Sequence, residues 1–462
     1  PAPALGPPSP PRWIARARPA ILRPADQRAA RAPRSGRSRH RIAMPAPAPL
    51  PAQGDLLAAE LALTRWITGF ALAHDDPAAL LAGFCERVVE AGVPLLRMGI
   101  AANVVHPLLQ GRGYNWRRGE AVERADLTRA VARRRDAVWR RSPFYALQPK
   151  GPTELRRTLG GSYKPGEFTM LDEFVGRGCT DYVAMLVPYG RDAASATPSG
   201  MLLSVQTDRA GGFANAELDL LRRLAQPLAH ACKTMTAVEA GRTLMATYLG
   251  RDPARQVLEG RIEQGRAEPV QAVLWSSDLV GFTRIADTLP RDRLLELLNA
   301  YADAVVASIT AQGGEVLKFI GDGIIAIFPL AAEGGPEGAC ARALDAAQAA
   351  LVAVEALGAT RASAGLSRTG LHLALHLGEV LYGNIGSRER LDFTVVGPAV
   401  NEVARIEAMC RSLDQRLVVS SAVAAAAGPA RARLVSLGRY ALRGVGRPQE
   451  LFTLDRDATS PR

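Results

Sequence analysis

Two aspartates, Asp278 and Asp322, lie in the second half of the chain, and each follows an apolar segment. The ends of such segments are positions where catalytic residues often lie. Asp278 ends the predicted strand QAVLWSSD, and Asp322 lies at the tip of a predicted hairpin in GGEVLKFIGDGIIAIF. If the two strands are neighbours, both carboxylates lie at one edge of a sheet. Carboxylate oxygens suit Mg²⁺ or Mn²⁺, and two such ions can serve an in-line phosphoryl displacement.

The hairpin residues also have an ordinary structural interpretation. An Asp-Gly pair is a favoured two-residue turn because the turn needs positive φ, so Asp322 and Gly323 need no chemistry to explain them. Lys318 is harder to explain, since a lysine inside a half-buried strand needs a partner. The turn LVGFT after Asp278 presents backbone N–H groups at a helix start, which is a natural seat for phosphate.

A predicted helix after Gly397 carries a second polar group. Asn401 and Arg405, four residues apart, share one face of this helix. The other side is predicted to face the core through Val403, Ile406 and Cys410. Taken alone, the polar pair is equally consistent with a solvated helix face.

In order and spacing, the segments SSDLVGFT, KFIGD, LDFTVVG and NEVAR resemble the motifs of the class III nucleotide cyclases, the adenylate and guanylate cyclase family. The resemblance covers roughly residues 268 to 455 and implies metal-binding, substrate-binding and catalytic positions. The implied metal ligands are Asp278, the backbone carbonyl of Leu279, and Asp322. The implied substrate contacts are Lys318, Thr394, Val280, Gly281, Phe282, Thr283 and Arg443. The implied catalytic residues are Asn401, which orients the ribose, and Arg405, which stabilises the transition state.

The activity implied by this resemblance is conversion of ATP into 3′,5′-cyclic AMP and pyrophosphate, with two Mg²⁺ or Mn²⁺ ions per active site. Lys318 can donate to adenine N1 and Thr394 can accept from the N6 amino group. Guanylate cyclases of the family usually carry an acidic residue at the lysine position. Family sites form between two catalytic domains, which implies a homodimer. The alternatives are a guanylate cyclase and a catalytically silent nucleotide-binding or dimerisation module.

The arrangement of predicted elements agrees with this family. Strands and helices alternate over residues 267–456, which indicates an α+β fold with layers around one sheet. The resemblance implies a ferredoxin-like, palm-type catalytic domain. Pro398 departs from the family, where many members have Asp, and this departure concerns the loop before the Asn/Arg helix.

Residues 51–232 are predicted to form a separate α/β domain. Strands are expected at 97–105, 181–188 and 200–206, with a helical stretch at 121–141. The last strand and closing helix of this region resemble a GAF-type sensor domain, so it is a GAF-like region open to a small-molecule effector that the sequence does not identify. Apolar residues from Leu221 to Leu249 follow coiled-coil spacing, which favours a dimerising helical connector over 233–266. The alternative is one amphipathic helix packed on its own domain.

The net charge of +12 is concentrated near the N-terminus. Residues 1–43 hold ten arginines and one aspartate, so residues 1–50 are predicted to be a disordered Pro/Ala/Arg-rich segment or a transit leader, and 457–462 a tail. Nucleic acid is therefore an unlikely partner. Arginines interleaved with Trp116 and Trp139 leave single-stranded nucleic-acid stacking as the alternative to a solvated helix face.

The remaining composition indicates where the protein works. No run of some 18 apolar residues exists, which predicts no membrane span. The five cysteines are scattered without a C-x-x-C pair, which is typical of a reduced protein without disulfides or zinc. A cytoplasmic location is the expectation.

Overall fold

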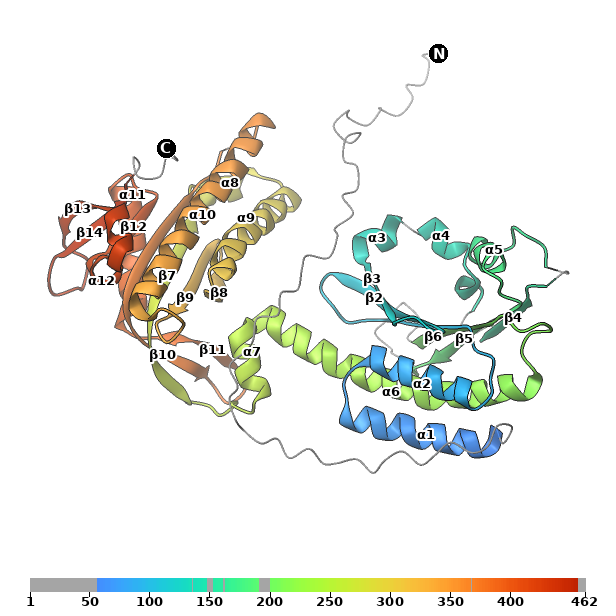
Figure 1. Ribbon diagram of the computed structural model, residues 1–462. Coiled ribbons are helices and arrows are strands. Elements are labelled where there is room, and N and C mark those ends of the chain that lie inside the picture. The colour runs from blue at the N-terminus through green and yellow to red at the C-terminus, as the bar shows by residue number, and fades with distance from the viewer. Residues whose placement is uncertain are drawn as a thin grey trace, which may run out of the picture. The chain divides into compact units, whose positions relative to one another are not determined.

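The computed structural model describes most of the chain after residue 55, namely residues 56–134, 136–147, 153–160, 163–190, 200–366 and 368–455. The predicted disordered segment 1–50 and the predicted tail 457–462 lie outside the described residues. Two β-sheets organise the described part, and each is surrounded by its own helices (Figure 1).

The first sheet contains six antiparallel strands in the order β3-β2-β1-β6-β5-β4. Their bounds are β1 (Arg97–Asn103), β2 (Leu109–Arg117), β3 (Glu123–Thr128), β4 (Glu154–Thr158), β5 (Asp181–Pro188) and β6 (Gly200–Thr207). The three strands expected from the sequence are confirmed as β1, β5 and β6. The helix expected over 121–141 is wrong at its start, where β3 pairs with β2, and only α3 (Arg129–Arg134) and α4 (Asp136–Arg140) are helical. Cross-strand pairing overrides local preference in this charged edge strand.

Helices cover both faces of this sheet (Figure 1). One face packs on α1 (Leu56–Ala73), α2 (Pro77–Glu90) and α6 (Asn215–Leu249) around a large buried apolar core. The other face carries α3, α4, a 3₁₀ turn (Pro143–Ala146) and α5 (Thr169–Gly176). Alternation along β1 places Met98 and Ile100 in the helix-packed core, as expected for a strand with period 2.

Helix α6 runs through the predicted boundary at residue 232. Leu221, Leu224, Leu228 and Met235, four positions of the predicted coiled-coil seam, are buried in the core of the first sheet. Over this part the alternative interpretation holds, because the helix packs on its own domain. Beyond Met235 the seam is more open, with Val238 37% exposed. The dimerising connector therefore stays a prediction for the last turns of α6 and the following α7 (Arg251–Leu258).

A buried ion pair joins β4, β5 and the start of α6. The carboxylate of Asp181 is fully buried, lies 2.7 Å from Arg156 Nη2 and accepts from the amide of Phe213 at 3.0 Å. Asp181→Ala leaves the Phe213 amide without this acceptor and Arg156 without its carboxylate, although Arg156 still donates to the Phe213 carbonyl at 2.8 Å. We therefore expect it to lower the free energy of unfolding by about 3 kcal/mol. Urea unfolding tests this against Asp208→Ala, which removes a largely exposed pair with Arg118 and should cost under about 1 kcal/mol. Equal losses in the two variants would contradict the prediction.

The second sheet has eight strands in the order β13-β14-β12-β10-β7-β9-β8, with β11 paired to β10. Their bounds are β7 (Ala267–Leu279), β8 (Glu315–Ile320), β9 (Gly323–Pro329), β10 (Leu371–Gly386), β11 (Leu391–Val396), β12 (Leu417–Ser420), β13 (Leu434–Tyr440) and β14 (Gln449–Leu454). Residues 371–386 form one long strand, β10, which pairs with β7, β11 and β12. The described β10–β12 pair is parallel and the other described pairs of this sheet are antiparallel.

Helices on both sides of the second sheet make the α+β layers that the sequence predicts. The long helices α9 (Arg291–Ala311) and α10 (Gly335–Ser363) pack on one face with Trp275 and Phe328. The opposite face packs on α11 (Pro398–Ser412) through a second apolar cluster. The short helices α8 (Phe282–Thr288) and α12 (Ser421–Ala426) and a 3₁₀ turn (Gly428–Arg433) complete this part. The fold class is confirmed.

Three helices contradict the expected absence of a membrane span. Among the described residues α1, α9 and α10 are long and apolar enough to cross a membrane by length and composition, with mean hydropathies of 1.4, 1.3 and 1.3. The expectations of no membrane span and of a plainly cytoplasmic protein are therefore wrong. The expectation rested on the absence of an unbroken apolar run. Helix α1 reaches a mean hydropathy of 1.4 although Glu60 and Arg65 interrupt its apolar residues.

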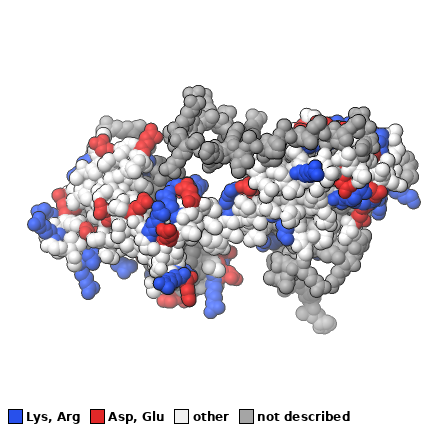
Figure 2. All heavy atoms as spheres, turned by 90° about the horizontal axis from the view of Figure 1, so that it is seen from below, with Lys and Arg blue, Asp and Glu red and all other residues white. Residues whose placement is uncertain are grey.

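Charged side chains on the described surface are mixed in sign. Figure 2 shows lysines and arginines next to aspartates and glutamates on the face in view, without one continuous basic patch. Trp116, one of the two aromatics considered for stacking on single-stranded nucleic acid, is only 4% exposed and belongs to the core of the first sheet. It is therefore not available to stack on bases.

Candidate active site

The hairpin between β8 and β9 differs in one respect from the sequence expectation. Ile320 pairs with Gly323, so the two turn residues are Gly321 and Asp322 rather than Asp322 and Gly323. The positive φ of the turn, 65°, lies on Gly321, where a missing Cβ makes it inexpensive. Asp322 is therefore not required by the turn's backbone geometry, and the ordinary explanation for this residue fails.

The two aspartates meet at the edge of the sheet, as predicted. β7 pairs with β9 up to Ser277 and Ile324, which places Asp278 beside the hairpin tip. The backbone N–H of Leu279 donates to Asp278 Oδ1 at 2.9 Å and to Asp322 Oδ2 at 3.2 Å. Two carboxylates thus converge on a single amide, although the residues are 44 positions apart in the sequence.

The electrostatics of this pair favour a bound cation. Burial, a hydrogen bond to Asp278 and the like charge of Asp278 raise the pKa of Asp322 to about 7. Two ionised carboxylates that share one amide repel each other, and this repulsion is costly unless a proton or a cation lies between them. Hard oxygen donors suit Mg²⁺ or Mn²⁺, which typically take one or two carboxylates, waters and substrate phosphates. The described residues contain no group of three His, Cys, Asp or Glu side chains that could hold a metal, so this pair would rely on such additional oxygen ligands.

A third carboxyl group, that of Glu407, interacts with Asp278, and it was not among the residues singled out from the sequence. Burial and, second, the negative charge of Asp278 raise the pKa of Glu407 to about 7, while Arg411 opposes the shift. Glu407 belongs to α11, whose residues pack against β7 and β10. The charge at this edge of the sheet is therefore more negative than the two predicted aspartates alone would make it.

One of the backbone amides in the turn after Asp278 already forms a hydrogen bond within the domain. The amide of Val280 donates to the carbonyl of Gly370 at 2.9 Å, so it is already paired. Gly281 adopts a left-handed conformation, with φ 74°, at the residue before α8. The amides of Phe282 and Thr283 open that helix and have no intrahelical acceptor. Phosphate binding by this turn stays a prediction and rests on Gly281, Phe282 and Thr283 more than on Val280.

Lys318 has the partner that a strand lysine requires. Its ammonium group forms an ion pair with Asp392 of β11, and both side chains are more than 40% exposed. Thr394 lies two residues further along β11, on the same side of the strand as Asp392. The structure therefore brings Lys318 and the strand that carries Thr394 together, because β8 lies beside β11. Asp392 was not singled out from the sequence.

Helix α11 presents Asn401 and Arg405 as predicted. Val403, Ile406 and Cys410 are buried, which confirms the core-facing side. Pro398 is the first helical residue, where its fixed φ and missing N–H are well tolerated, so this family departure fits a regular helix start. The Arg405 guanidinium passes close to Gly444, where a Cβ would lie 3.3 Å from Nη2.

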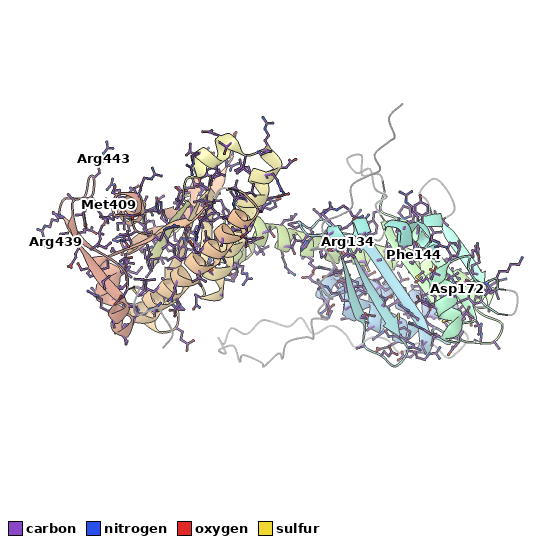
Figure 3. All side chains as sticks on the ribbon, turned by 90° about the horizontal axis from the view of Figure 1, so that it is seen from above. Arg134, Phe144, Asp172, Met409, Arg439 and Arg443 are labelled. Carbon is purple, nitrogen blue, oxygen red and sulfur yellow. The ribbon has the colours of Figure 1, made fainter. Side chains whose placement is uncertain are left out.

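Arg443 is next to this contact but behaves differently. Its side chain is exposed and points away from the domain (Figure 3). No described contact joins it to the aspartate pair or to Lys318. Its predicted substrate role remains a prediction.

Comparison with known proteins gives the family. Residues 265–455 match the family model of the adenylate and guanylate cyclase catalytic domain. This part of the chain is a class III nucleotide cyclase catalytic domain. The cyclase domain thus comprises the second sheet, its helices and every predicted site residue.

Relatives and solved structures are similar to part of this chain. An uncharacterized protein of Mycobacterium tuberculosis is 31% identical over 219 residues, 47% of this chain and 37% of that protein, and one of Mycobacterium bovis is 34% identical over 215 residues, 46% and 38%. The matched stretch thus spans well under half of these curated relatives. The adenylyl cyclase CyaB from P. aeruginosa is 21% identical with a TM-score of 0.38, covering 41% of this chain and 96% of that one. The guanylyl cyclase Cya2 is 27% identical with a TM-score of 0.35, covering 42% and 97%.

Proposed function

We propose that the cyclase domain converts ATP into 3′,5′-cyclic AMP and pyrophosphate, with two Mg²⁺ or Mn²⁺ ions bound at Asp278 and Asp322. The observation that carries the proposal is the convergence of these carboxylates on the Leu279 amide, with the pKa of Asp322 raised to about 7. Divalent cations bound there would neutralise phosphate charge and make the ribose 3′-hydroxyl more acidic.

The remaining site residues of the chain supply binding and orientation. Asn401 orients the ribose, so that the 3′-oxygen attacks the α-phosphorus while the bond to pyrophosphate breaks. The 3′-hydroxyl proton leaves to solvent, and negative charge develops on the α-phosphate and the leaving group. Arg405 places a fixed cation against that charge, which is the kind of contribution that lowers a barrier most.

The choice of adenine rests on hydrogen-bond polarity. Lys318 offers only donors and suits the N1 acceptor of adenine, whereas guanine N1 is itself a donor. Thr394 accepts from the adenine N6 amino group, and guanine has an acceptor at that place. The ion pair with Asp392 holds the Lys318 ammonium near β11, where Thr394 lies.

We infer that the working unit is a homodimer with the active site shared between two copies. Support comes from apolar side chains left exposed on β8, β11 and the adjacent β10, namely Phe319, Ile320, Leu381, Leu391 and Val396. Their exposed fractions run from 38% to 58%, which is high for large apolar residues gathered on neighbouring strands. A second copy would cover them, and the N-terminal part would then regulate the pair.

Base selectivity is the most specific test of this proposal. We expect the wild-type protein to favour ATP over GTP by about 10²-fold in kcat/KM, since a mismatched buried donor or acceptor is costly. Lys318→Glu should lower kcat/KM for ATP by about 10²-fold and leave or raise that for GTP. Rates of cyclic AMP and cyclic GMP formation give both ratios, with Lys164→Glu as a charge-matched control outside the cyclase domain. A wild-type preference for GTP would contradict the assignment and favour a guanylate cyclase.

A further inference from the structure

The face of the first sheet that lies under α3, α4 and α5 is hollow. Strand alternation sends Met98 and Ile100 into the packed core and sends Arg97, Gly99 and Ala101 to the opposite face. On that opposite face small side chains recur on neighbouring strands, for example Gly113 of β2 and Ser204 of β6. Small residues leave a cavity of ≈ 470 Å³ where a packed core would need large apolar side chains. This volume suits a small-molecule site.

The cover over this cavity is apolar and aromatic. Trp139 of α4, Phe144 of the 3₁₀ turn, Phe174 of α5, Met170 and Leu127 line it. Figure 3 places Phe144 over the strands of the first sheet. Trp139 and Leu127 remain 44% and 36% exposed, so the aromatic cover is not consumed by core packing. Aromatic rings line one side of the cavity and glycines of the sheet line the other side. The shape of the cavity therefore suits a flat ligand.

One end of the cavity carries the guanidinium group of Arg97. Arg97 Nη2 donates to Asn115 Oδ1 at 3.1 Å, and its guanidinium carbon lies 5.2 Å from the centre of the Phe174 ring. Within the described residues Arg97 has no ion pair with a carboxylate. By contrast Arg112, which also lines the cavity, is paired with Asp126 at 2.7 Å and with Glu239.

Polar neighbours and charge reinforce this picture of Arg97. Gln206, directly opposite Arg97 on β6, is only 1% exposed, and Ser204 is 7% exposed, so polar groups are held against the cavity in the sheet. Burial, followed by the like charge of Arg177, lowers the pKa of Arg97. A half-buried guanidinium with surplus positive charge around it is stabilised by an anion.

We propose that this cavity binds a small organic anion, with a planar apolar body between the aromatic cover and the sheet and one carboxylate, phosphate or sulfonate group on Arg97. The proposal is independent of the cyclase reaction. It assigns to the first sheet a ligand of defined chemistry, and it accounts for Trp139, which need not belong to a nucleic-acid surface.

Two fluorescent probes that differ by one sulfonate group test this assignment on the full chain. 1-Anilinonaphthalene-8-sulfonate carries a sulfonate, and N-phenyl-1-naphthylamine is its neutral counterpart. We expect one saturable site per chain for each probe. Arg97→Met should weaken the sulfonate probe by about tenfold or more and leave the neutral probe within about twofold, because only the first loses a charge-assisted hydrogen bond. Arg97→Lys should lie between the wild type and Arg97→Met.

Two further variants separate the cavity from other surfaces. Arg117→Met removes an exposed arginine that lies opposite Arg97 in the β1–β2 register but does not line the cavity. Because solvent screens this exposed charge, the variant should change each affinity by less than about twofold. Leu202→Trp fills the cavity and should abolish saturable binding of both probes, with a cooperative thermal transition verifying the fold. Equal weakening of both probes by Arg97→Met, loss in Arg117→Met, or full binding in Leu202→Trp would each overturn the proposal.

Discussion

Asp322→Asn is expected to lower kcat for cyclisation by about 10³-fold while making the metal-free protein more stable at pH 8. The catalytic loss follows from removing one of two carboxylates that would hold the divalent cations. The gain in stability follows from removing one of two like charges that share the Leu279 amide. Opposite effects on activity and stability are the mark of a residue kept for chemistry.

The pH dependence of this stability has a definite sign. The folded-state pKa of Asp322 is about 7, above its ordinary value of 3.8. A raised folded-state pKa contributes stability that is fully present below the ordinary value and lost as pH rises through about 7. Because solvent reaches this pair, we expect Asp322 to account for a loss of only about 1–2 kcal/mol between pH 5 and pH 8 in the wild type. Asp322→Asn should show a smaller loss, because the raised pKa of Glu407 remains in that variant.

Urea unfolding in a chelating buffer at pH 5 and pH 8 measures this difference. Asp303→Asn, an exposed aspartate of α9 on the same domain, is the matched control and should follow the wild type in stability and activity. Retention of activity in Asp322→Asn within threefold of wild type, or equal pH profiles for the two proteins, would contradict the role given to the aspartate pair.

Two inactive variants are expected to restore each other's activity when they form a heterodimer. Arg405→Ala alone should lower kcat by about 10²-fold or more, because it removes the cation aimed at the developing charge. In a site shared between two copies, the metal aspartates of one chain work with Arg405 of its partner chain. A heterodimer of Asp322→Asn with Arg405→Ala therefore keeps one intact site of two, and about half of wild-type activity is expected.

Coexpression with two different tags and purification through both isolates this heterodimer. The control heterodimer combines Asp322→Asn with Asp278→Asn, which damages both shared sites and should stay inactive. No activity in the first heterodimer would place the whole site within one chain, and activity in the control would contradict the assignment of both aspartates of a site to the same chain. Phe319 and Ile320, which are exposed beside the Asp322 turn, would lie in the interface of the proposed homodimer.

The placement of four candidate site residues could be predicted from the sequence because they stand at strand ends and on one helix face. Neighbouring strands bring Asp278 and Asp322 together, and i, i+4 spacing places Asn401 and Arg405 on one side of α11. The turn residues were assigned wrongly because Gly321 and Gly323 both supply freedom in φ, and only the β8–β9 register decides between them.

Contacts between segments that are far apart in the sequence could not be predicted from local residue patterns. The partner of Lys318 is Asp392, 74 residues away, and the pairing depends on β8 lying beside β11. In the sequence Glu407 has the pattern of an ordinary helix glutamate. Only the packing of α11 brings it close enough to Asp278 for the two carboxyl groups to interact.

The part before the cyclase domain was less predictable. β3 carries charged and polar residues suited to either a helix or an edge strand, so its pairing with β2 decided the outcome. The cavity next to Arg97 is invisible in the sequence, since it depends on which strand positions face each way across six strands. The three helices that are long and apolar enough to cross a membrane were not predicted, because isolated charged residues interrupt their apolar segments.

Product analysis of the full chain with ATP and Mg²⁺ or Mn²⁺ tests the central claim most directly. Chromatography with mass detection should show cyclic AMP and pyrophosphate in equal amounts, much less product from GTP, and none from Asp322→Asn. Formation of ADP and phosphate, of cyclic GMP alone, or of no product by an assembled dimer would contradict the account.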